Sequence, residues 1–207
     1  MILPTGFDLL LWVGLHVVIQ VVYNLCLPLK DLTRVKLRKK FENLVYTLAY
    51  ASVAYYLGDQ GTVWDWYTAV ALVVAFVGFD LLGRVSFLQN SLRGVEDWSV
   101  WAYVVYGSAG VIGLVAAAYH AWLAVEADVW IWWGGCLLVA VVANVLPGYL
   151  LRAEGDGVLD WLIFSHHWQI GLILVLFARF PEIISQVSAG ICQGIFLHGA
   201  TVYGVSG

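Results

Sequence analysis

Histidines and carboxylates supply the side chains of this chain that are best suited to chemistry. His166 and His167 are adjacent, and His198 follows in a separate apolar segment. Imidazoles exchange protons near neutral pH and bind metals readily, so all three are candidate catalytic groups, and they would be the ligands of a metal if one is bound. Asp80 and Asp160 are the carboxylates expected to act with them. No spacing in the chain identifies a cofactor.

The spacing of these residues limits how they could cooperate. Asp160 and His167 are seven residues apart, which puts them on nearly the same face of a helix but about 10 Å apart along its axis. Gly190, Gly194 and His198 recur at intervals of four. Glycines on one helix face let a neighbouring backbone approach closely. We therefore expect His198 to lie toward the helix that carries His167.

A second set of polar side chains forms a stripe near the N-terminus. Asp8, Trp12, His16, Gln20 and Asn24 follow one another at intervals of four. Each step of four advances about 40° around a helix, so the stripe winds slowly and faces protein rather than lipid. It indicates either interhelical hydrogen bonds or one wall of a polar cavity. In the second interpretation, the last four residues of the stripe bind substrate together with Trp168, Gln193 and Asn144.

Asp80 and Arg84 form a pair of opposite charges one helical turn apart. One interpretation is a structural ion pair, since residues four apart are neighbours on a helix surface. The other is a carboxylate used for proton transfer, which the neighbouring arginine keeps ionised.

The composition indicates what kind of elements must position these residues. Of the 207 residues, 62% are hydrophobic and 12% are charged, against roughly 45–50% and about 25% in soluble domains. A soluble globule of this size cannot bury so much apolar surface, so a soluble domain, a disordered chain and a disulfide scaffold are excluded. We predict a multi-pass protein of the cell membrane whose first partner is the lipid bilayer.

The apolar segments can be counted with the thickness of that bilayer. A hydrocarbon core of about 30 Å needs about 20 apolar residues per helix. This predicts one all-α domain over residues 1–207, a bundle of about seven transmembrane helices at 7–28, 42–58, 66–84, 98–125, 129–151, 158–179 and 183–203. Most of the tryptophans fall near the ends of these spans, as in the aromatic belts at membrane surfaces.

Charge gives the orientation. Six of the ten basic residues lie between positions 30 and 40, with an apolar segment on either side. The positive-inside rule then places the N-terminus outside and the C-terminus in the cytoplasm. This basic segment is expected to anchor the chain at the cytoplasmic surface, with affinity for anionic lipid headgroups, and no nucleic-acid partner is expected. The oligomeric state is left open.

Two classes of membrane protein are excluded by side chains that the chain lacks. All lysines lie between positions 30 and 40, so the last predicted helix offers no amine for a retinal Schiff base. Five histidines are too few for the multiple-histidine di-iron sites of membrane desaturases.

Three functions remain open at this point, besides a structural or assembly subunit of a larger complex. The first is a membrane-embedded enzyme that acts on a lipid or isoprenoid-like substrate in a cavity lined by His and Asp. The second is a small transporter, channel or sensor with a polar lane along the first helix. The third is a b-type haem protein for electron transfer, with His16 and His120 in the outer half of the membrane and His198 with His166 or His167 in the inner half.

Overall fold

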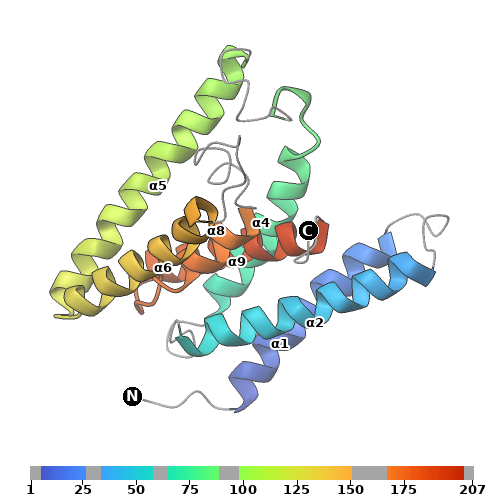
Figure 1. Cartoon of the computed structure of the whole chain (residues 1–207), viewed down its shortest axis with the longest axis horizontal. Coiled ribbons are helices and arrows are strands. Elements are labelled where there is room, and N and C mark those ends of the chain that lie inside the picture. Colours follow the sequence, from blue (N-terminus) through green and yellow to red (C-terminus); the bar gives the residue numbers. More distant parts are fainter. Residues whose placement is uncertain (1–5, 27–33, 58–64, 89–97, 151–166, 203–207) are drawn as a thin grey trace. The chain divides into compact units, whose positions relative to one another are not determined.

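The computed structural model describes residues 6–26, 34–57, 65–88, 98–150 and 167–202, and these contain helices and turns but no strand (Figure 1). The prediction of an all-α chain is confirmed over these ranges. The elements are α1 (Gly6–Cys26), α2 (Arg34–Leu57), α4 (Trp66–Leu82), the short 3-10 helix η2 (Ser86–Leu88), α5 (Val100–Glu126), α6 (Trp130–Leu150), α8 (His167–Val175) and α9 (Ile183–Val202).

Two of the described helices, α5 and α9, are long and apolar enough to cross a membrane. Their bounds agree closely with the predicted spans 98–125 and 183–203. Helices α1, α4 and α6 also lie where spans are predicted, whereas the prediction of seven crossings stays a prediction.

Two described helices differ in extent from the spans predicted there. Helix α2 begins at Arg34, inside the basic segment, rather than at residue 42. Lysine and arginine are good helix formers, so the helix continues through the charged residues. Helix α8 ends at Val175 rather than at residue 179. The amides of Leu176 and Phe177 bond to carbonyls three residues back, and the residue before Pro181 is disfavoured in a helix. The start of this predicted span lies outside the described residues.

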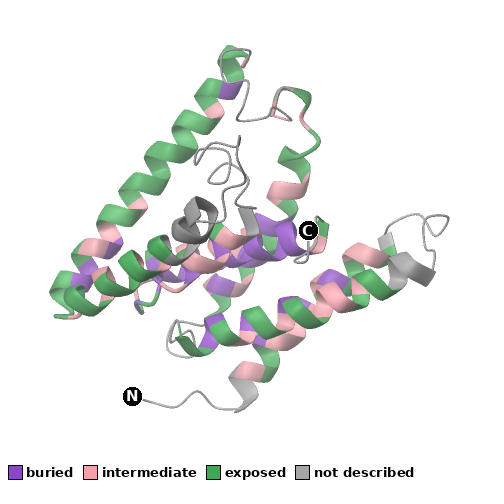
Figure 2. Cartoon of the chain, in the orientation of Figure 1, coloured by how far each residue is buried: buried purple, intermediate pink, exposed green. Residues whose placement is uncertain are grey.

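The chain divides into two compact units, Met1–Phe79 with His167–Gly207, and Asp80–His166. In the first unit the buried residues are concentrated on α9 (Figure 2). Helices α8 and α2 both pack on α9, and its Phe196 and Ala200 form an apolar cluster with Ala51 of α2. Helix α9 is thus the centre of this unit.

Three glycines allow the backbones around α9 to approach closely. A Cβ placed at Gly190 would meet the Thr68 carbonyl and lie 2.7 Å from the Ala71 Cβ, and one at Gly194 would lie 2.6 Å from the Ala75 Cβ. These contacts advance in the same direction along both helices, so α4 and α9 run parallel. On α8, a Cβ at Gly171 would lie 2.6 Å from the Cys192 carbonyl oxygen of α9. The close helix packing expected at Gly190 and Gly194 is confirmed, but the neighbour of both glycines is α4 and not the helix that carries His167. The His198 ring also lies against α4, so the expectation that these glycines turn His198 toward His167 is wrong.

The second unit contains the hairpin of α5 and α6. Its turn closes with two hydrogen bonds, from the Asp128 amide to the Val125 carbonyl at 3.0 Å and from the Val129 amide to the Ala124 carbonyl at 2.9 Å. This is the bonding pattern of a Schellman cap, and Asp128 takes its left-handed position with φ 54°. An aspartate tolerates this conformation better than most residues do.

Helix α5 exposes an almost wholly apolar surface. In the most apolar stretch of 18 residues of α5, only 6% of the residues are buried. Its small residues Gly107, Gly110 and Gly113 have no atom within 4 Å of where a Cβ would be. Near the turn, the exposed aromatic side chains are Trp122, Trp130 and Trp132.

Candidate functional site

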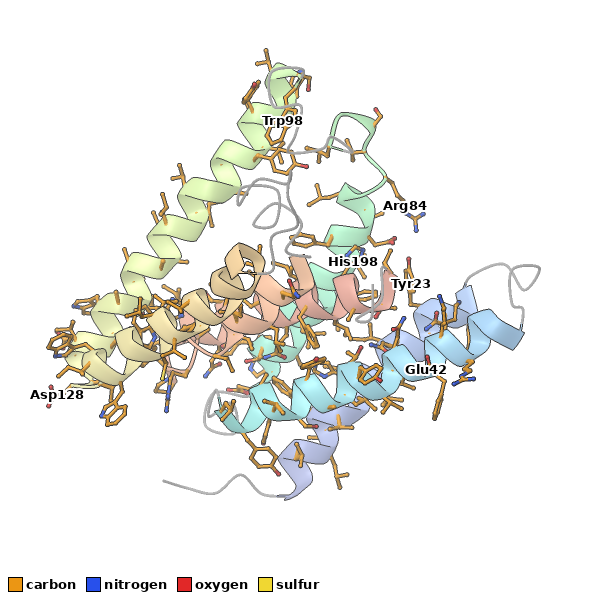
Figure 3. The ribbon with its side chains drawn as sticks, viewed as in Figure 1. Tyr23, Glu42, Arg84, Trp98, Asp128 and His198 are labelled. Atoms are coloured by element: carbon orange, nitrogen blue, oxygen red, sulfur yellow. The ribbon has the colours of Figure 1, made fainter. Side chains whose placement is uncertain are left out.

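His198 is buried on α9, with 4% of its surface exposed. Its ring lies against two phenylalanines of α4, with centroid distances of 5.7 Å to Phe76 and 6.2 Å to Phe79. Phe76 also packs edge-on against Tyr23 of α1 at 5.6 Å. The imidazole therefore sits against two aromatic rings of α4, and Tyr23 of α1 packs behind one of them (Figure 3).

The packing of α8 on α9 fixes the level of His167. The two helices are antiparallel neighbours, and Gly171 faces the turn of α9 between Cys192 and Phe196. His167 lies one turn before Gly171 on α8, and His198 lies about one turn beyond this part of α9. The backbone of His167 is therefore at about the level of His198. Its side chain is outside the part of the structure that is described, as are residues His166 and Asp160.

The stripe on α1 is buried for three of its residues. Trp12 and His16 are 0% exposed and Gln20 is 3% exposed. The His16 ring lies 5.1 Å from the Trp12 ring, and its Nδ1 is 2.8 Å from the Trp12 carbonyl oxygen. The Nε2 atoms of His16 and Gln20 have no hydrogen-bond partner among the described residues. Two buried nitrogen atoms one turn apart thus lack a hydrogen-bond partner among the described residues.

The remaining residues of the stripe differ from these three. Asn24 is half-buried, and its Nδ2 donates to the Gln20 carbonyl oxygen at 2.9 Å. The side chain of Asp8 lies outside the described part of the chain.

Helix α2 supplies residues that sequence reasoning missed. Tyr55 is fully buried, and its ring lies 5.1 Å from that of Trp12 at 64°. Thr47 is also fully buried, and its hydroxyl donates to the Asn43 carbonyl at 2.7 Å. The sequence signal was weak, because Tyr55 stands in a tyrosine-rich segment where adjacent tyrosines have very different exposure.

The phenylalanines around His198 were also missed. Phe76 and Phe79 are two apolar residues in an apolar helix, so nothing in their type sets them apart. Only the parallel packing of α4 on α9 shows that they face a histidine.

Gln193, Trp168 and Asn144 were predicted to bind substrate as well. Gln193 is 1% exposed on α9. Trp168 lies on α8 and Asn144 on α6, with side chains outside the described part. The structure therefore brings Gln193 into the interior of the first unit and leaves the other two as predictions.

The Gln186 side chain has a structural contact. Its Nε2 donates to the Pro181 carbonyl at 2.9 Å, and the neighbouring Ser185 hydroxyl accepts a hydrogen bond from the Phe180 amide at 3.2 Å. Both bonds close the turn before α9.

Asp80 forms an ion pair with Arg84. The Arg84 Nη2 donates to the Asp80 Oδ2 at 2.6 Å, with the arginine side chain 71% exposed and the carboxylate side chain 20% exposed. Asp80 belongs to the second unit and His198 to the first, so joint action of the two stays a prediction.

No group of three His, Cys, Asp or Glu side chains gathers among the described residues. A metal set of His166, His167 and His198 includes two side chains outside that part. For the outer haem pair, His16 and His120 belong to different units. The His120 Nδ1 lies 2.7 Å from the Ala116 carbonyl oxygen. Nothing in these contacts favours haem over the other functions.

Comparisons of the chain with protein-family models, curated proteins and solved structures found no match. Its function is therefore argued from the buried polar groups of α1 and α9.

Proposed function

We propose that the chain is a multi-pass membrane protein and an enzyme that acts on a lipid or isoprenoid-like substrate, with His198 as its acid–base group. The observation that carries this proposal is the burial of His198 among aromatic side chains, level with the backbone of His167. Polar groups in the interior of a membrane protein are costly and commonly functional.

The directions of the helices support several crossings. Helix α4 runs parallel to α9, and α8 runs antiparallel to it. Helix α2 is antiparallel to α1, because Trp12 pairs with Tyr55 while Asn24 and Lys40 line one groove at the other end. Consecutive spans of a multi-pass protein must run in opposite directions, and spans separated by an odd number of others must run in the same direction. The apolar surface of α5 supports the same proposal, since a soluble protein rarely exposes so large an apolar patch.

The surroundings of His198 suit a substrate with a long apolar part. Aromatic walls with a few convergent polar groups are typical of sites for such ligands. An imidazole there would take a proton from a substrate hydroxyl or give one to a leaving oxygen, with the neighbouring helices excluding water. His167 is the proposed second histidine of this site.

A transporter, channel or sensor is the second candidate, and the α1 stripe favours it. His16 and Gln20 are buried with their Nε2 atoms lacking partners among the described residues. A buried polar group without a partner costs about 1–3 kcal/mol. A ligand or a file of water molecules along this stripe would offset that cost by forming the missing hydrogen bonds.

The enzyme proposal is tested by the lipids of cells that express the full chain. We expect wild-type chain to change the level of one lipid or isoprenoid class, measured by mass spectrometry of total extracts. The variant His198→Gln should abolish the change while it is still recovered in membranes at a normal level.

The matched control is His120→Gln, which alters a buried histidine in the other unit. It should leave the lipid change intact. An identical lipid profile for wild type, His198→Gln and cells without the chain would contradict the enzyme and leave the transporter or sensor.

A further inference from the structure

A groove of about 190 Å³ lies between the end of α1 and the start of α2. It is lined by one face of each helix, namely by Gln20, Val21, Asn24, Leu25, Lys40, Phe41 and Leu44. The two helices are antiparallel, so Leu25 and Lys40 lie at the end of the groove where α1 finishes and α2 begins, here called its mouth. Gln20 and Leu44 lie about 6–8 Å deeper at a rise of 1.5 Å per residue. The groove thus has apolar walls with polar groups at its two ends.

The mouth of this groove lies in the most basic part of the chain. Residues 30–42 hold six basic residues and only two acidic ones, Asp31 and Glu42. The Arg38 Nε donates to the Glu42 Oε1 at 2.8 Å, so the carboxylate of Glu42 is already paired, on the part of α2 labelled in Figure 3. Lys39 is exposed and Lys40 is half-buried. A lysine with its stem along an apolar wall and its ammonium at the rim suits an anionic headgroup.

The inner end of the groove offers an unsatisfied amide. Gln20 lines the groove, is 3% exposed, and its Nε2 has no hydrogen-bond partner among the described residues. Leaving such a donor buried is unfavourable, and an acceptor oxygen of a ligand would satisfy it. Asn24, one turn nearer the mouth, also lines the groove and donates to the Gln20 carbonyl oxygen.

We propose that this groove binds one anionic phospholipid. The phosphate lies against the Lys40 ammonium at the mouth, an ester carbonyl accepts from the Gln20 amide, and an acyl chain runs along Val21, Phe41 and Leu44. Charge complementarity selects the headgroup, and the apolar walls select a lipid over free phosphate. The site rests on the membrane-embedded part of the proposed function and is independent of the reaction at His198.

The experiment is native mass spectrometry of the full chain in detergent, mixed with dioleoyl phosphatidylglycerol or dioleoyl phosphatidylcholine. Wild type should retain one phosphatidylglycerol in clear preference to phosphatidylcholine. Lys40→Gln should lower this retention by about fivefold, the factor for one lysine near an anionic headgroup. Leu44→Trp, which fills the groove, should abolish it. The matched control Lys39→Gln removes an exposed charge beside the groove and should change retention less than twofold, by about the worth of an exposed charge.

Equal retention of the two lipids by wild type would overturn the site, as would equal losses for Lys39→Gln and Lys40→Gln. If Leu44→Trp aggregates, Gln20→Met decides in its place, because it keeps the size of the side chain and removes the amide. Recovery of the chain without detergent, in the soluble fraction, would instead contradict the membrane embedding of the proposed function. The two failures are therefore distinguishable.

Discussion

The imidazole of His198 on α9 lies edge-on against the ring of Phe76 on α4, with 5.7 Å between the ring centroids and 73° between the planes. Phe76 packs in the same way against Tyr23 of α1. Three helices far apart in the sequence thus meet around Phe76. This packing holds the imidazole in place and surrounds it with apolar groups, which strengthens any electrostatic interaction it makes with a substrate.

The glycines that seat α4 on α9 give the first prediction. Gly190→Ala and Gly194→Ala should each lower the free energy of unfolding by about 1–3 kcal/mol, the usual cost of overpacking a close contact. Their new Cβ atoms would meet backbone and Ala71 or Ala75. Thermal unfolding in detergent measures the effect. Gly110→Ala is the matched control, because a Cβ there meets nothing within 4 Å, and it should be neutral or slightly stabilising. Equal stability of all three variants would show that α4 and α9 do not pack in this way.

The buried ring of His16 gives the second prediction. We expect His16→Leu to leave stability unchanged or to raise it by about 1 kcal/mol, because the Nε2 atom that it removes is buried without a partner among the described residues. Denaturant titration measures this, with His120→Leu as a comparison. Both variants lose a ring contact to the carbonyl four residues back, that of Trp12 or Ala116, but only His16→Leu also removes an atom buried without a partner among the described residues, so His120→Leu should be the more destabilising of the two. A loss of more than about 2 kcal/mol for His16→Leu would mean that His16 is a structural residue.

The ion pair between Asp80 and Arg84 gives the third. Because the arginine is mostly exposed, Asp80→Asn should cost no more than about 0.5 kcal/mol of stability. The same variant measured in the lipid assay separates the two interpretations of this carboxylate. Loss of the lipid change at normal stability assigns Asp80 to catalysis, and retention of it leaves a surface ion pair only.

Side-chain accessibility in intact cells gives the fourth, which concerns topology. In a chain whose native cysteines are replaced by serine, Asp65→Cys and Asp128→Cys should react with a membrane-impermeant maleimide from outside. Lys39→Cys should react only after the cells are opened. All three side chains are exposed in the structure. A difference in their labelling therefore shows on which side of the membrane each lies, and is not caused by burial inside the protein. Labelling of all three from outside would contradict the predicted orientation.

Much of the helical architecture could be predicted from the sequence, because apolar length is a one-dimensional signal. The bounds of α5 and α9 follow from it directly. The start of α2 could not be predicted in this way. The count of apolar residues ends at the charged residues, whereas the helix continues through lysine and arginine.

The site could be predicted only in part. Polar residues in apolar helices are conspicuous, so His16, Gln20 and His198 could be singled out, and the interval of four on α1 predicted a face that is indeed buried. The partners Phe76, Tyr55 and Thr47 could not, because their selection depends on how helices distant in sequence pack together. Spacing along one helix does not contain that information.

Photo-crosslinking from the neighbourhood of His198 shows whether a lipid or isoprenoid lies beside this histidine. A benzophenone amino acid at Phe79, whose ring contacts His198, is compared with one at Val74, which is exposed on the same helix, and the captured lipids are identified by mass spectrometry. We predict that Phe79 captures one lipid or isoprenoid class far out of proportion to its abundance, whereas Val74 captures the bulk mixture. The same mixture at both positions, or no lipid at Phe79, would contradict it.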